Sequence, residues 1–129
     1  MFRLAKILDS SNATENAVEL RIKANGPIAP GSAVSCTNNV LFNTAADSAP
    51  DYILARYSNT NDAKICYTVT NDMIFKVEFN AVVSPKLGMK VGLSKSMSDA
   101  DCVTYNSNGK GIIVGIENQN MVYVRFQKS

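Results

Sequence analysis

Apolar and polar residues alternate with a period of two along most of this 129-residue chain, a pattern that favours strands over helices. Residues 18–23 alternate without exception, while 65–70 and 73–79 are rich in β-branched and aromatic side chains. Because successive side chains of a strand point to opposite faces, these segments predict strands. Further strands are predicted at residues 2–8, 52–57, 90–93, 102–105, 112–117 and 121–126.

Turns are predicted from asparagine, which occurs fourteen times and gathers between the apolar runs. The pair Asn71-Asp72 predicts a hairpin between its flanking strands, because Asn and Asp tolerate the positive φ of a tight turn. Residues 118–120 predict a second short turn between strands. Other polar turns are predicted at residues 38–39, 59–62 and 106–109. The best candidate helix is one or two turns at residues 94–100.

The expected fold is all-β: one small single-domain β-barrel or sandwich with short strands and at most one short helix. The length suits one domain, and a composition of 46% hydrophobic and 19% charged residues suits a globular core. Two sets of alternating residues without charge are predicted to form that core: Phe75, Val77 and Phe79, and Val122, Val124 and Phe126. We divide the chain into an N-terminal arm and polar spacer, residues 1–15, and a single β domain, residues 16–129.

The arm begins with an apolar and cationic segment, residues 1–8, which a polar spacer at 9–15 separates from the next strand. Such a segment either closes the protein's own sheet or adds as a strand to another molecule. In the second case it contributes less to the fold than to binding, and the side chains that bind the partner are Phe2, Arg3, Leu4, Lys6, Ile7 and Leu8. The charges within it argue against a secretory signal, and no apolar run is long enough to predict a membrane span.

Histidine is absent, which removes the usual general base and the commonest ligand of transition metals. Cys36, Cys66 and Cys102 are odd in number and widely spaced, so neither a disulfide framework nor a zinc site is expected. The three thiols are predicted to be reduced. We therefore predict that the protein is not an enzyme and has no catalytic residue, no metal ligand and no cofactor.

Asp99 and Asp101 stand in a polar stretch and are predicted to be solvated turn acids, because the ligand spacing of a calcium loop is missing. The glycine-rich stretch 108–111 lacks the spacing of a phosphate loop and predicts a hairpin turn instead. A net charge of +2 spread along the chain offers no basic stripe, so no nucleic-acid partner is expected.

Several glycines are predicted to occupy turns or bends: Gly31, Gly88, Gly92, Gly109 and Gly111. In residues 87–92 the two glycines stand where a strand must bend or meet another backbone closely, and Val91 is expected to point inward.

The order of these motifs forms a layout that covers about four fifths of the chain. It consists of Gly-Pro-Ile-Ala-Pro-Gly at 26–31, Asp-Tyr-Ile-Leu-Ala at 51–55, the strands 65–70 and 73–79, Lys-Leu-Gly-Met-Lys-Val-Gly-Leu at 86–93, Gly-Lys-Gly-Ile-Ile-Val-Gly-Ile at 109–116 and Val-Tyr-Val-Arg-Phe at 122–126. This layout resembles that of the small head-decoration, or capsid-cementing, proteins of tailed bacteriophages, a β-rich group related to the lambdoid decoration trimers.

The resemblance implies a β-tulip-like form of the predicted fold. It also implies a structural virion protein that binds the outer surface of a phage capsid and stabilises the head. It implies the major capsid protein as partner, a homotrimer as the assembled form, and a place on the capsid surface after assembly in the host cytoplasm. Many weak, identical contacts on a symmetric lattice would then add up to firm binding. Two alternatives stay open: a small barrel that serves as an adaptor or tail component of a virion, and a carbohydrate- or oligonucleotide-binding barrel.

Overall fold

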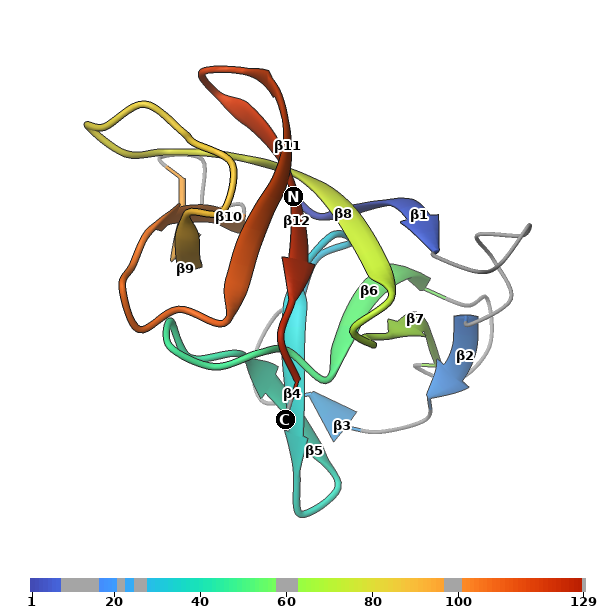
Figure 1. The fold of residues 1–129 in the computed structure, drawn as a ribbon. Coiled ribbons are helices and arrows are strands. Elements are labelled where there is room, and N and C mark those ends of the chain that lie inside the picture. Colours follow the sequence, from blue (N-terminus) through green and yellow to red (C-terminus); the bar gives the residue numbers. More distant parts are fainter. Residues whose placement is uncertain (8–16, 21–22, 25–27, 58–62, 97–100, 129) are drawn as a thin grey trace.

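The computed structural model describes residues 1–7, 17–20, 23–24, 28–57, 63–96 and 101–128. Within these ranges the backbone forms strands, turns and bends but no helix, which confirms the all-β prediction (Figure 1). Nowhere in them is there a helix long and apolar enough to cross a membrane.

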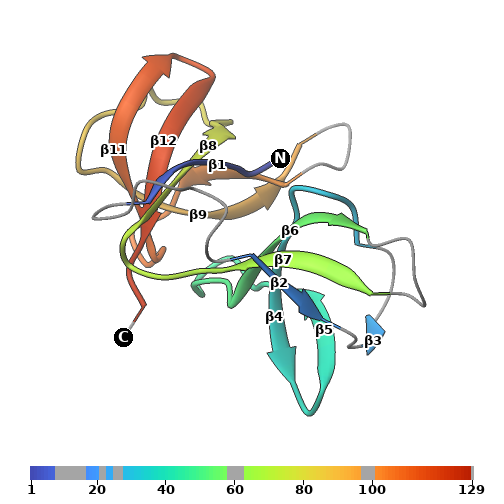
Figure 2. The same ribbon diagram turned by 90° about the vertical axis from the view of Figure 1, so that its right-hand side faces the viewer.

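Two six-stranded sheets make up the described part of the chain (Figure 2). The first sheet is antiparallel, in the order β1 (Arg3–Ile7), β8 (Met73–Glu78), β12 (Met121–Phe126), β11 (Gly111–Asn118), β9 (Lys90–Lys95) and β10 (Asp101–Tyr105). The second sheet has the order β2 (Ala17–Leu20), β7 (Lys64–Thr68), β6 (Tyr52–Tyr57), β4 (Ala33–Thr37), β5 (Val40–Asn43) and β3 (Lys23–Ala24). Its pairs are antiparallel except for the parallel pair of β3 and β5.

The main core lies on the inner face of the first sheet. Both predicted sets of core residues are buried, which confirms that prediction. One set lies on β8 and includes Phe79 just after it, and the other lies on β12. Ala33 and Ile53 of the second sheet pack against the same cluster and so join the two sheets. A smaller cluster lies within the second sheet and contains Ile28, Val34, Leu41, Leu54 and Cys66. Burial of apolar side chains is the main source of stability in such a domain, at roughly 1.5–3 kcal/mol for each large side chain.

The first sheet curls back on itself but does not close. Its last strand, β10, returns to the end of β8, where one parallel bridge joins Val103 to Phe79. A closed barrel would need a continuous ladder at this point. Of the two predicted architectures, a small sandwich-like domain therefore fits and a closed barrel does not.

One hairpin was not predicted from the sequence. β4 and β5 pair antiparallel on either side of Asn38 and Asn39, and project from the second sheet (Figure 2). Both asparagines have positive φ, 52° and 61°, as a tight two-residue hairpin turn requires. The predicted turn at 38–39 is confirmed, whereas the two strands on either side of it were not predicted.

The hairpin predicted at Asn71-Asp72 is wrong. A turn does lie there, but β7 before it belongs to the second sheet and β8 after it belongs to the first. The turn therefore carries the chain from one sheet to the other. The turn at Gln119-Asn120, by contrast, joins β11 and β12 as a true hairpin, and the backbone N–H of Asn120 donates to Oδ1 of Asn118 at 2.8 Å.

The candidate helix at 94–100 is also wrong in its described part, because β9 continues as a strand to Lys95. Cross-strand pairing with β10 as far as Lys95 opposite Asp101 explains this extension. Residues 97–100, and the turn predicted at 59–62, lie outside the described residues.

Candidate functional site

The N-terminal segment is a strand of the protein's own first sheet. β1 pairs antiparallel with β8, and Leu4 lies opposite Phe75. The Phe2 ring is 2% exposed and lies between two core rings, with centroids 6.2 Å from Phe75 and 5.6 Å from Phe126. Of the two expectations for this segment, closure of the protein's own sheet is the arrangement found. The buried ring argues against an arm that contributes little to the fold.

The other candidate binding residues of the arm have different surroundings. Arg3 is exposed and lies opposite Lys76, whereas Leu4 is half-buried against the core. The backbones of Lys6 and Ile7 pair with β8, and Leu8 lies outside the described residues. Among the candidate side chains whose exposure the structure describes, Phe2, Arg3 and Leu4, it is therefore Arg3 that is best placed to reach a partner.

The chain start also joins the two sheets. The Met1 ammonium donates to Oε2 of Glu78 at 2.7 Å and to the carbonyl oxygen of Asp101, both in the first sheet. The backbone N–H of Phe2 donates to the carbonyl of Gly31 at 2.9 Å, just before β4 of the second sheet. Gly31 has a φ of 87°, and a Cβ at this position would collide with the Met1 side chain. The prediction of a turn glycine at position 31 is confirmed.

Asp101 was predicted to be a solvated turn acid, and this is wrong. It is the first residue of β10 and only 7% exposed. Its Oδ2 accepts a hydrogen bond of 2.6 Å from the backbone N–H of Ala33, and its Oδ1 forms an ion pair with Lys95. A buried carboxylate is stable only when its oxygens are paired in this way. Asp99 lies outside the described residues.

The remaining predicted glycines lie in tight places or at a turn. A Cβ at Gly92 would lie 2.6 Å from the carbonyl oxygen of Ala46, and one at Gly109 would collide with the backbone of Val91. A Cβ at Gly111 would lie 2.9 Å from side-chain atoms of both Val91 and Val124. Gly88 has open space around it but a φ of 84°. Val91 is fully buried, as predicted.

All three cysteines are free. Cys66 is buried in the second sheet, and burial raises the pKa of its thiol from 9.0 to about 11, partly opposed by the charge of Lys64. Burial also raises the pKa of Cys102, although a hydrogen bond with the Ser94 side chain partly opposes this effect. Because the thiolate is the nucleophilic form, both groups are poor nucleophiles near neutral pH. Cys36 is half-buried.

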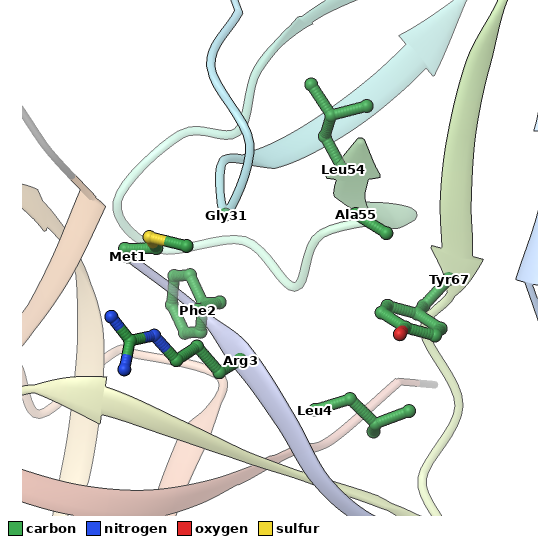
Figure 3. A pocket seen from close by; sticks show the side chains of 8 residues that line it. All are labelled: Met1, Phe2, Arg3, Leu4, Gly31, Leu54, Ala55 and Tyr67. Atoms are coloured by element: carbon green, nitrogen blue, oxygen red, sulfur yellow. The ribbon is translucent and has the colours of Figure 1, made fainter. Parts of the chain in front are cut away.

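A small pocket of about 250 Å³ opens beside the N-terminal strand, between the two sheets (Figure 3). Most of the residues that line it are apolar, and its polar side chains are those of Arg3 and Tyr67. Figure 3 shows the Arg3 guanidinium directed away from Tyr67. The lining therefore offers contact to an apolar group, but no acid–base pair and no nucleophile.

An exposed apolar surface lies at the other end of the first sheet, and we call it the apolar ledge: Val82, Val83 and Tyr105. Val82 is fully exposed, Val83 is 46% exposed and Tyr105 is 54% exposed. They border a shallow hollow of about 470 Å³ together with Asn80, Ala81 and Thr104. Sequence reasoning missed this surface. The sequence feature that could have revealed it is the apolar run at residues 81–83, which lies between β8 and β9 and belongs to neither strand.

Within the described ranges, no group of three or more Cys, Asp or Glu side chains is placed to hold a metal ion. Neither a model of a known family nor a curated protein matches the chain.

Proposed function

We propose that this chain is a structural virion protein that binds the outer surface of a tailed-phage capsid and stabilises the head. The observation that carries the proposal is the apolar ledge, where two adjacent valines and a tyrosine are exposed around one shallow hollow. Exposed apolar surface of this kind is typical of contact sites between proteins. The resemblance to head-decoration proteins supplies the class of partner.

The ledge is held in place by the sheet beneath it. The connection that carries it leaves β8 at Phe79, which bridges to Val103 of β10. The backbone N–H of Asn80 then donates to the carbonyl of Val103 at 2.9 Å. Tyr105 stands two residues further along β10. Anchoring the connection at Phe79 and Asn80 lowers the conformational entropy that the ledge loses when it binds a partner.

Each ledge contact is modest in energy, because a fully buried valine contributes roughly 1.5–3 kcal/mol before the cost of association. A homotrimer would present three ledges, and simultaneous binding raises the effective affinity strongly. The proposed partner is the major capsid protein, and the proposed location is the virion surface. An adaptor or tail component would use the same surface toward a different virion partner.

Co-sedimentation with phage heads tests this function. The probe is a preparation of heads of the phage that encodes the chain, purified without the protein, and tails are tested in parallel. Wild-type protein is expected to sediment with heads, and Val82→Asp to lose this binding with an unchanged melting temperature. Val18→Asp is the matched control, because Val18 is 38% exposed in the second sheet.

The outcomes are distinct. Failure of the wild-type protein to sediment with heads would overturn the proposal, and sedimentation with tails alone would favour the adaptor role. Equal binding of wild type and Val82→Asp would remove the ledge as the contact surface.

A further inference from the structure

The outer face of the first sheet gathers cations that are far apart in the sequence. Arg3 of β1 lies opposite Lys76 of β8, and Lys76 lies opposite Tyr123 of β12. Arg125 follows Tyr123 on the same face of β12 and lies opposite Ile112 of β11. Because the residues between them, among them Phe75 and Val124, are buried in the core, these side chains lie on the opposite side of the sheet.

Two of these cations have no ionic partner among the residues that the structure describes. Lys76 forms an ion pair of 3.0 Å with Glu117, and Glu78 is occupied by the Met1 ammonium at 2.7 Å. Arg3 and Arg125 appear in no ion pair with the described residues. Two guanidinium groups on one sheet face are therefore without an ion-pair partner in the described part of the chain. Arg3 and Arg125 are separated by β8 and offset by two residues along the strands, which places their backbones roughly 12 Å apart.

The surface between the two arginines is suited to a protein contact. Tyr123 lies against Gly115 of β11, where a Cβ would be 3.2 Å from the ring, so the glycine gives the ring room beside the sheet. Ile74, Ile112 and Met121 are only half-buried. Arg, Tyr and Met are enriched in protein interfaces, and Arg and Tyr supply many of the residues that dominate binding energy.

We infer that this arginine face, defined by Arg3, Tyr123 and Arg125, binds an acidic protein surface. The inference rests on the proposed function, and the acidic surface is that of the major capsid protein. Carboxylates are the complementary groups, because guanidinium accepts them in bidentate hydrogen bonds and is weakly hydrated. In this proposal the arginine face selects an acidic partner, and the apolar ledge contributes apolar surface that is buried on binding.

Single-stranded nucleic acid is a poorer match for the same face. Such binding uses several stacking rings along a groove of unpaired cations. Among the described residues of this face the one ring is that of Tyr123, and Lys76 is already paired with Glu117. The face is also half apolar, which favours a folded protein partner over a polyanion.

The experiment measures binding to the same undecorated heads, at low and high salt, for two double variants with equal change of charge. Arg3→Glu with Arg125→Glu alters the arginine face, and Lys86→Glu with Lys110→Glu alters two exposed lysines elsewhere. The first pair is expected to weaken binding at least roughly tenfold and to abolish its salt dependence. The second pair is expected to bind like the wild type, and thermal melts establish that every variant is folded.

Three results would overturn the inference. If the arginine variant binds heads as wild type does, with the same salt dependence, the face is not used and the proposed function stands. If wild-type protein binds no heads, the proposed function fails and the inference fails with it. If wild-type protein binds a fluorescent poly(dT) oligonucleotide and the arginine variant does not, the face binds nucleic acid instead of an acidic protein.

Discussion

The carboxylate of Asp101 accepts a hydrogen bond of 2.6 Å from the backbone N–H of Ala33, which joins an edge strand of the first sheet to the middle of the second. Lys95 balances the charge of this carboxylate, and Met1 donates to the carbonyl of the same residue. One residue therefore connects β10, β9, β4 and the chain start. This connection lies beside the largest apolar core, where the two sheets meet.

Replacement of Asp101 is expected to destabilise the domain. Asp101→Ala leaves the buried N–H of Ala33 without its acceptor and should cost about 1–3 kcal/mol in the free energy of unfolding. Asp101→Asn keeps an acceptor and should cost less. Urea titration followed by fluorescence or circular dichroism measures both. Asp72→Ala is the control, because this exposed turn residue should change stability by less than about 0.5 kcal/mol. Equal effects of the two alanine variants would contradict a structural role for Asp101.

Sequence patterns predicted the strands well, because alternation and β-branched residues are local properties. They could not predict which strands pair, since pairing depends on contacts between distant residues. Asn71-Asp72 shows the difference. The two residues form a turn, as their local chemistry predicts, but the strands on either side, β7 and β8, belong to different sheets and do not pair. Asn38-Asn39 has similar chemistry and does form a hairpin.

The candidate surfaces depended even more on tertiary structure. Asp101 is polar and follows a polar stretch, so nothing local distinguishes it from a solvated acid. Its burial arises because Ala33 approaches it from sixty-eight residues away. Arg3 and Arg125 likewise come together only through the register of β1, β8 and β12. Cationic residues that are far apart in the sequence can thus lie near one another on one face of a sheet.

Close backbone approach makes Gly109 more sensitive than Gly88. Gly109→Ala places a Cβ against the Val91 carbonyl, and backbone cannot move aside cheaply, so a loss of about 2–3 kcal/mol or more is expected. Gly88→Ala meets no neighbour but must adopt positive φ, which costs about 1 kcal/mol. Thermal melts of both variants rank the two costs. A larger loss at Gly88 would mean that the turn conformation, and not the contact with Val91, limits stability.

The buried thiol of Cys66 predicts a loss of stability in alkali. Its pKa is about 11 in the folded chain and 9.0 when exposed, so the folded state holds the proton more tightly. The resulting stabilisation is fully present below pH 9.0 and is lost as the pH rises toward 11, with a total of order 2 kcal/mol. Chemical denaturation at several pH values measures it. Cys66→Ala should be less stable at neutral pH but show a shallower decline in this window, and parallel curves for the two proteins would refute the assignment.

The three thiols should differ in their reactivity toward an alkylating reagent. Cys36 is half-buried, while Cys66 and Cys102 are buried with raised pKa values. Mass spectrometry should therefore show one rapid modification at Cys36 in the folded protein. Cys66 and Cys102 should react only after unfolding. A native disulfide between any two of them, or rapid modification of all three, would contradict the structure.

The Phe2 ring should be essential for the fold, because it fills the space between Phe75 and Phe126. Phe2→Ala removes a fully buried aromatic side chain and is expected to cost about 3–5 kcal/mol, whereas Phe2→Leu should cost less because it retains more of the volume. Arg3→Ala changes an exposed neighbour on the same strand and should alter stability by less than about 0.5 kcal/mol. A chain that lacks residues 2–8 should accordingly lose its cooperative thermal transition, since the first sheet would lose β1 and the core would lose this ring. If the shortened chain melts cooperatively and only fails to bind heads, the segment is a docking arm after all, and the packing of Phe2 adds little to the domain.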